Sequence, residues 1–173
     1  DEVLKGIYDF GATHIWYTCV IEHATLSDYS QFNIKPDHPA TVKGKAGSPY
    51  AIKDYYDIDP DLAENVPYRM EEFESLVQRT HKAGLKVIID FVPNHVARQY
   101  HSDVKPKGVK DLGEDDDTSI DFSPKNNFYY IPNEEFHGQF DLLSTAEKPY
   151  FEFPAKATGN DRFDAYPNSN DWY

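Results

Sequence analysis

The sequence predicts an α/β fold in which helices cover a parallel sheet. The first half of the chain twice repeats one local plan: an amphipathic helix, a glycine and a short segment rich in β-forming residues. The second of these segments is almost wholly apolar, as is typical of strands buried on both faces of a parallel sheet. Alternation of helices with buried strands therefore predicts two strands of such a sheet, each preceded by a helix.

The first copy of this plan opens the chain. Its apolar side chains recur at helical spacing at Val3, Leu4, Ile7 and Phe10. Gly11 suits the left-handed conformation that ends many helices. Residues 13–20 follow, too short a run for another helix and rich in β-forming side chains. We therefore expect a helix that ends near Gly11 and a strand within 13–20.

The second copy follows the same order. Its helical stripe consists of Met70, Phe73, Leu76, Val77, Thr80 and Ala83. Pro67 precedes this stripe, Gly84 ends it, and the apolar run 85–89 comes next. We expect a second helix and a second buried strand.

The rest of the chain reads differently. Residues 21–66 are rich in Asp, Tyr, Pro, Lys and Gly, and a loop of that length in a compact domain is usually functional. In residues 97–173 neither period persists, so an irregular region with few short strands is expected. The acidic run 114–117 reads as a solvated loop. The loss of periodicity after residue 96 divides the chain into 1–96 and 97–173.

Composition excludes several classes of protein. The 173 residues include 17 basic and 30 acidic side chains, a formal net charge of −13, which argues against binding nucleic acid through its phosphates. Apolar residues make up 39%, enough for a core, but no apolar run approaches the roughly 20 residues of a membrane span. Cys19 is the single cysteine, which excludes an internal disulfide framework.

Polar side chains gather just after each predicted strand. Glu22 and His23 follow the first, and Asp90, Asn94 and His95 follow the second. In parallel α/β folds the functional site lies at that edge of the sheet. A carboxylate that ends an apolar strand needs a cationic or hydrogen-bonding partner, so Asp90 is either a site residue or the cap of a tight turn. His95 is either a site residue or a structural histidine.

These residues carry a resemblance to a known family. Asp-Phe-Val-Pro-Asn-His at 90–95 resembles the first signature region of the α-amylase family, glycoside hydrolase family 13, which ends the third strand of a (β/α)8 barrel. Residues 11–18, 48–60 and 82–89 resemble the segments that surround it in that family, in the same order. The resemblance covers about residues 1–100.

The resemblance implies a fold and its division. Residues 1–96 would form part of a (β/α)8 TIM barrel, its second and third strands with their helices. Residues 97–173 would be most of domain B, an irregular, mixed insertion, truncated at its end. The nucleophile and the acid/base of the family would lie beyond residue 173, so the fragment alone is expected to be inactive.

The resemblance also implies roles for single residues. Asp90 would help hold the site together by pairing with an arginine beyond this chain. Asn94 would supply a calcium ligand, His95 a hydrogen bond to the sugar in subsite −1, and Tyr50 the ring on which that sugar stacks. The cofactor implied is calcium, and the partner an α-glucan such as starch or a maltooligosaccharide.

Four functions stay open at this point. The first is part of a retaining α-glucan hydrolase, and the second a transglycosylase or an isomerase that interconverts maltose and trehalose. The third is a non-catalytic carbohydrate-binding member. The fourth, a calcium module on residues 114–117, lacks the alternating ligands and the glycine of a calcium loop. The resemblance favours a secreted or periplasmic protein, while oligomeric state and linkage stay open.

Overall fold

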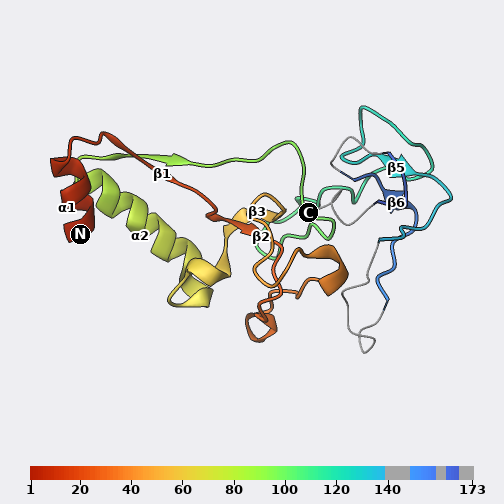
Figure 1. Ribbon diagram of the computed structural model, residues 1–173, viewed down its shortest axis with the longest axis horizontal. Coiled ribbons are helices and arrows are strands. Elements are labelled where there is room, and N and C mark those ends of the chain that lie inside the picture. The colour runs from red at the N-terminus through yellow and green to blue at the C-terminus, as the bar shows by residue number, and fades with distance from the viewer. Residues whose placement is uncertain (139–148, 159–162, 168–173) are drawn as a thin grey trace.

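The computed structural model describes residues 1–138, 149–158 and 163–167 (Figure 1). Its helices and strands are α1 (Glu2–Asp9), β1 (His14–Tyr17), β2 (Ile21–His23), β3 (Ile52–Ile58), α2 (Arg69–Lys82), β4 (Lys86–Ile89), β5 (Tyr130–Ile131) and β6 (Ala155–Lys156). In Figure 1, α1, α2 and the β1–β4 pair lie at one end, β5 and β6 at the other, and β2 and β3 between them. None of the helices in the described part of the chain has the length and apolar character needed to cross a membrane.

The two helix–strand units form as expected. β1 and β4 pair in parallel, from His14 opposite Lys86 to Tyr17 opposite Ile89. Both helices run into a glycine with positive φ, +98° at Gly11 and +84° at Gly84, as predicted for left-handed helix ends. The helix–glycine–strand plan is therefore confirmed, and so is the parallel pairing.

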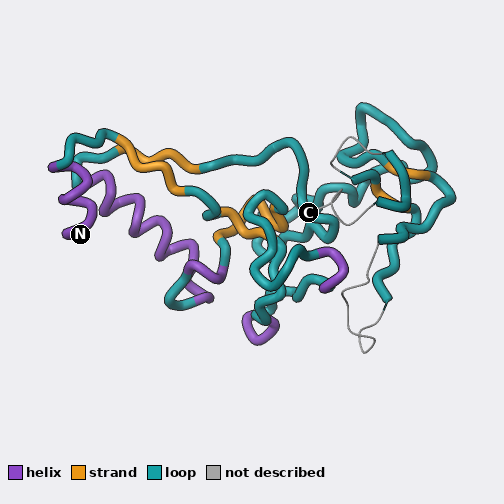
Figure 2. Tube along the Cα trace, in the orientation of Figure 1, coloured by secondary structure: helices purple, strands orange, loops and turns teal. Residues whose placement is uncertain are grey.

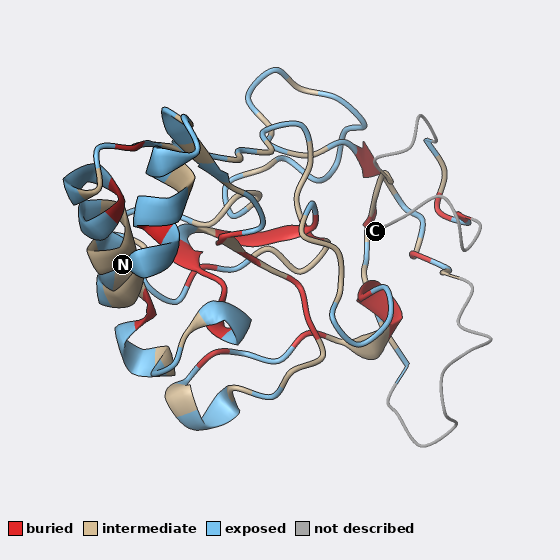
Figure 3. Cartoon of the chain, turned by 60° about the vertical axis from the view of Figure 1, so that its left-hand side comes forward, coloured by how far each residue is buried: buried red, intermediate tan, exposed pale blue. Residues whose placement is uncertain are grey.

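The prediction of two buried strands, the second of them buried on both faces, is wrong for the described residues. Trp16 in β1 is 63% exposed and Ile88 in β4 is 48% exposed. Helix α2 packs against β4, but the sheet has only these two strands within the described residues, so much of its apolar surface lacks cover. Figure 3 shows that exposed and intermediate residues also make up most of the helices beside the N-terminus.

Residues 21–66 are not the simple loop that was expected. They contain β2 and β3, which pair antiparallel, together with short 3-10 turns (Figure 2). They also contribute most of a buried cluster that consists of Ala24, Val42, Ala51 and Ala97. The pairing is irregular, because Ile21 lies opposite Ile58 but Glu22 lies opposite Asp54. A bulge in β3 therefore changes the direction of its side chains.

The second half carries β5 and β6, an antiparallel pair beside a small core that consists of Ile131, Phe136, Ala155 and Ala165. Arg98 connects this part to the chain after β4, through Glu152 Oε1 at 2.5 Å and the Lys156 carbonyl oxygen at 3.0 Å. Residues after position 96 also contact β3, since the His101 N–H donates to the Lys53 carbonyl. The division into 1–96 and 97–173 stays a prediction, and parts of its second segment lie outside the described residues.

Candidate functional site

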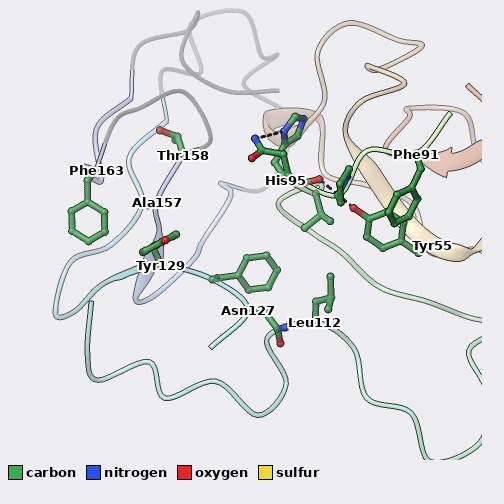
Figure 4. A pocket seen from close by; sticks show the side chains of 13 residues that line it. Tyr55, Phe91, His95, Leu112, Asn127, Tyr129, Ala157, Thr158 and Phe163 are labelled. Carbon is green, nitrogen blue, oxygen red and sulfur yellow. Dashed lines mark hydrogen bonds between the residues drawn. The ribbon is translucent and has the colours of Figure 1, made fainter. Parts of the chain in front are cut away.

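A pocket of about 670 Å³ opens where the chain leaves β4 (Figure 4). Its walls come from β3, from the segment after β4 and from residues around β5 and β6. The lining residues are Tyr55, Phe91, Pro93, Asn94, His95, Val96, Leu112, Asn127, Phe128, Tyr129, Ala157, Thr158 and Phe163. Aromatic rings and polar side chains therefore line the same cavity.

Tyr55 of β3 fixes the segment that carries the signature residues. Its hydroxyl donates to the carbonyl oxygen of Val92 at 2.5 Å and lies 3.4 Å from that of His95. Its ring lies 5.5 Å from that of Phe91, and burial raises the pKa of its hydroxyl. The chain after β4 is thus held against β3 by a hydroxyl that stays protonated at neutral pH.

Two of the four predicted site residues line this pocket. Asn94 and His95 lie side by side there, with Asn94 Nδ2 at 3.4 Å from His95 Nδ1. Tyr50 is 52% exposed and is not a lining residue. Asp90 ends β4, where its N–H donates to the Tyr17 carbonyl. Within the described residues its carboxylate has neither a hydrogen bond nor an ion pair.

The structure places Glu22 and His23 elsewhere, although both follow β1 along the chain. His23 Nδ1 lies 2.6 Å from Asp59 Oδ2, and its Nε2 lies 3.0 Å from the Ala46 carbonyl oxygen. Burial alone would lower the pKa of His23, but the Asp59 carboxylate outweighs burial and raises it. His23 is thereby held as a structural histidine.

Glu22 belongs to a cluster of carboxylates that sequence reasoning missed. One oxygen from each of Glu22, Asp54, Asp57 and Asp103 lies within 4.8 Å of the others. Burial raises the pKa of Glu22 to about 8. Lys53 lowers this pKa, and the neighbouring carboxylates raise it further. Two carboxylates in the mostly apolar stretch 52–58 were the signal that could have drawn attention to this cluster.

The calcium ligand expected at Asn94 receives no support from neighbouring acidic groups. Within 1–138, 149–158 and 163–167, the carboxylate cluster around Glu22 is the one group of three or more acidic, histidine or cysteine side chains arranged to hold a metal. The acidic run 114–117 instead organises its own loop, because Asp116 accepts from the N–H groups of Asn127 and Phe128. Calcium at Asn94 therefore stays a prediction.

The described lining residues offer the groups that a carbohydrate-binding site uses. The apolar face of a pyranose can stack on rings such as Phe128 and Tyr129, while Asn94, His95 and Asn127 can exchange hydrogen bonds with sugar hydroxyls. Glycoside hydrolysis needs two carboxyl groups about 5 Å apart in retaining enzymes. None of the described lining residues carries a carboxylate.

Comparison with known families decides the relationship. Residues 2–148 match the family model described as "Alpha amylase, catalytic domain". The chain belongs to the α-amylase family. The signature segment 90–95 and the parallel β1–β4 pair lie within the matched residues, so membership implies part of a TIM barrel.

Individual relatives of the α-amylase family match shorter segments. The Amino acid transporter heavy chain SLC3A1 of Rattus norvegicus is 43% identical over 51 residues, 30% of this chain and 7% of that protein. Maltase 1 of Drosophila virilis is 36% identical over 67 residues, 39% of this chain and 10% of that protein. Trehalose-6-phosphate hydrolase of Bacillus subtilis is 43% identical over 51 residues, 30% of this chain and 8% of that protein.

These matches span a tenth or less of each relative's length. No solved structure matches the chain significantly. Several of the relatives are named as glycoside hydrolases, which supports a carbohydrate-active family member.

Proposed function

We propose that this chain is part of a retaining, α-glucan-active glycoside hydrolase and contributes part of its subsite −1. The observation that carries the proposal is the pocket after β4, in which the signature residues Asn94 and His95 share a cavity with several aromatic rings. Family membership supplies the reaction class, and relatives named maltase and trehalose-6-phosphate hydrolase make an α-glucoside the favoured substrate.

On this proposal each predicted residue keeps one role. His95 donates a hydrogen bond to a sugar hydroxyl, and the exposed ring of Tyr50 stacks on the sugar. Asp90 pairs with an arginine and Asn94 supplies a calcium ligand, each with partners outside the described residues. The nucleophile and the acid/base come from sequence other than these 173 residues.

The proposal is tested on the full-length protein that carries this chain. Release of shorter α-glucans with retained anomeric configuration is the expected result with maltooligosaccharides, and β-linked cellooligosaccharides should not react. Conservation of mass with maltose converted to trehalose would show the isomerase instead. Activity on neither α-glucans nor α-glucosides would overturn the proposal.

A matched pair of variants tests the pocket itself. Tyr129 lines the pocket and is 55% exposed, whereas Tyr68 lies outside it and is 58% exposed. We expect Tyr129→Ala to weaken maltooligosaccharide binding about tenfold, since a stacked ring contributes about 1 kcal/mol or more, and Tyr68→Ala to leave it unchanged. Equal binding by both variants would remove the pocket from the binding site.

A non-catalytic member is the second candidate function. A relative named as an amino acid transporter heavy chain matches as well as the named hydrolases do, so similarity in this region does not separate the two classes. The absence of all glycosidase activity, together with loss of the carboxylates that end the later strands, would favour this candidate.

A further inference from the structure

We propose that Glu22, Asp54, Asp57 and Asp103 form a binding site for a hard divalent cation, with calcium preferred. The site lies between the β2–β3 pair and the chain after β4, and it shares no residue with the sugar pocket. It is also separate from the calcium ligand that the family resemblance places at Asn94. The proposal therefore stands apart from the proposed function.

The first argument is geometric. Four carboxylate oxygens, one from each side chain, lie within 4.8 Å of one another, close enough to touch a single ion. Asp54 and Asp57 would ordinarily point to opposite faces of β3, because successive strand residues alternate. The bulge between the Ile21–Ile58 and Glu22–Asp54 pairs removes that alternation and turns both toward Glu22.

The second argument is that two buried carboxylates of the cluster each have an oxygen without a hydrogen bond. Glu22 is 2% exposed, and its Oε2 is buried without a hydrogen-bond partner within the described residues. Asp54 is fully buried as well. Its Oδ1 accepts the Tyr56 N–H at 2.7 Å, and the Ser102 hydroxyl lies near the carboxylate, but its Oδ2 has no hydrogen bond of normal geometry within the described residues. A buried carboxylate oxygen without a partner is costly, and a cation between the two would satisfy both.

The third argument is the charge balance. Two cations reach the cluster: Arg69 pairs with Asp57 and lies 3.6 Å from Asp103 Oδ2, and Lys53 lies 3.9 Å from Glu22 Oε1. Lys53 is closer to Asp37, at 3.1 Å. Even with Glu22 protonated, four aspartates share two positive charges, which leaves room for a divalent cation.

The ligand chemistry selects the class of ion. All four groups offer oxygen and none offers nitrogen or sulfur, which favours calcium or magnesium over zinc and copper. Calcium accepts several carboxylates in irregular geometry and gives up its water readily, whereas magnesium retains water and demands an octahedron. Three buried carboxylates from two strands and one from a loop suit calcium better.

The experiment is calcium titration of the full-length protein after chelator treatment, followed by calorimetry. Glu22→Gln keeps the shape of the side chain and removes its charge, and the matched control is Asp115→Asn in the exposed acidic run. We expect one calcium site to weaken at least tenfold in Glu22→Gln and to be unchanged in the control. Magnesium should bind that site more weakly than calcium.

A second variant guards against misfolding. Asp103 is an exposed residue in the chain after β4, outside the helices and strands. Asp103→Asn should therefore preserve the fold and also weaken the same site. Asn94→Ala reports the other expected calcium position and should leave this one intact. Calcium binding that is lost only in Asn94→Ala, or that is equal in Glu22→Gln, Asp103→Asn and the control, would overturn the proposal. Magnesium binding as tight as calcium would overturn the preference for calcium.

Discussion

At the scale of single residues, position along the strands decides what each polar group can do. Asp54 and Tyr55 are neighbours in β3, yet Asp54 joins the carboxylate cluster and Tyr55 holds the pocket loop. Adjacent residues of a strand point to opposite sides, and the bulge returns only Asp57 to the side of Asp54. One strand therefore supports two separate sites.

His95 carries the sharpest prediction on activity. In the full-length protein, His95→Ala should lower kcat about tenfold or more and change KM less, if its hydrogen bond strengthens as charge develops on the sugar ring. His14→Ala, an exposed histidine of β1 outside the pocket, is the control. Steady-state kinetics on a maltooligosaccharide provides the measurement, and an unchanged kcat would remove His95 from the site.

The two helix-ending glycines allow backbone strain to be separated from packing. Both have positive φ, but a Cβ at Gly84 would lie 2.9 Å from Tyr8 Cε2, whereas one at Gly11 would meet nothing within 4 Å. Gly11→Ala should cost about 1 kcal/mol of unfolding free energy through strain alone. Gly84→Ala should cost more, because the Tyr8 ring must also move. Urea denaturation of both variants tests this, and equal losses would show that the ring moves without cost.

At the scale of elements, the antiparallel β2–β3 pair is the centre of the described structure. The pocket after β4, the carboxylate cluster and the buried core around Ala24 all include residues of this pair or of the chain next to it. The β1–β4 sheet contributes no residue to these sites, but the segment that follows β4 lines the pocket. The sheet therefore positions that segment.

Arg98 is the main polar link between the chain after β4 and β6. Arg98 and Glu152 are both largely buried, and the guanidinium also lies 3.7 Å from the centre of the Phe136 ring. Arg98→Ala leaves the Glu152 carboxylate without this partner, so we expect a loss of about 3–5 kcal/mol of unfolding free energy. Because Ala157 and Thr158 line the pocket just after β6, sugar binding should weaken too.

Arg79→Ala is the control for this link, since Arg79 is exposed and lies 3.6 Å from Asp1 Oδ1. An exposed pair of this kind contributes about 0–1 kcal/mol. Denaturant unfolding followed by fluorescence measures both variants. Losses of similar size would mean that Arg98 contributes no more than a surface ion pair.

At the scale of the whole molecule, the β1–β4 sheet leaves large apolar side chains uncovered. Trp16 of β1 is 63% exposed and Ile88 of β4 is 48% exposed, so part of the apolar surface of this sheet faces solvent. In a closed (β/α)8 barrel, neighbouring strands and helices cover such surfaces.

Residues 1–173 expressed alone should therefore associate or remain poorly soluble. The unpaired strand edges and the exposed apolar surface of the β1–β4 sheet can both bind to other copies of the chain. Trp16→Thr should reduce this association, and Phe151→Ser, an exposed phenylalanine outside the sheet, should not. Size-exclusion chromatography with light scattering tests both. A monomeric sample that unfolds cooperatively would contradict the expectation.

The sequence by itself determined the helix–glycine–strand units and the family. The period of the apolar residues, Gly11 and Gly84, and the segment 90–95 are local signals that need no knowledge of distant contacts. The same signals predicted Asn94 and His95 as site residues; the structure places both in the pocket after β4, and their roles stay predictions.

Tertiary structure alone decided the carboxylate cluster and the exposure of the sheet. Glu22, Asp54 and Asp103 are far apart in sequence, and their meeting depends on the bulged pairing of β2 with β3, which no periodicity reveals. The apolar residues of β1 and β4 predicted burial, but burial depends on which other elements cover a strand. Local pattern fixes what each segment can form, and long-range packing fixes what it touches.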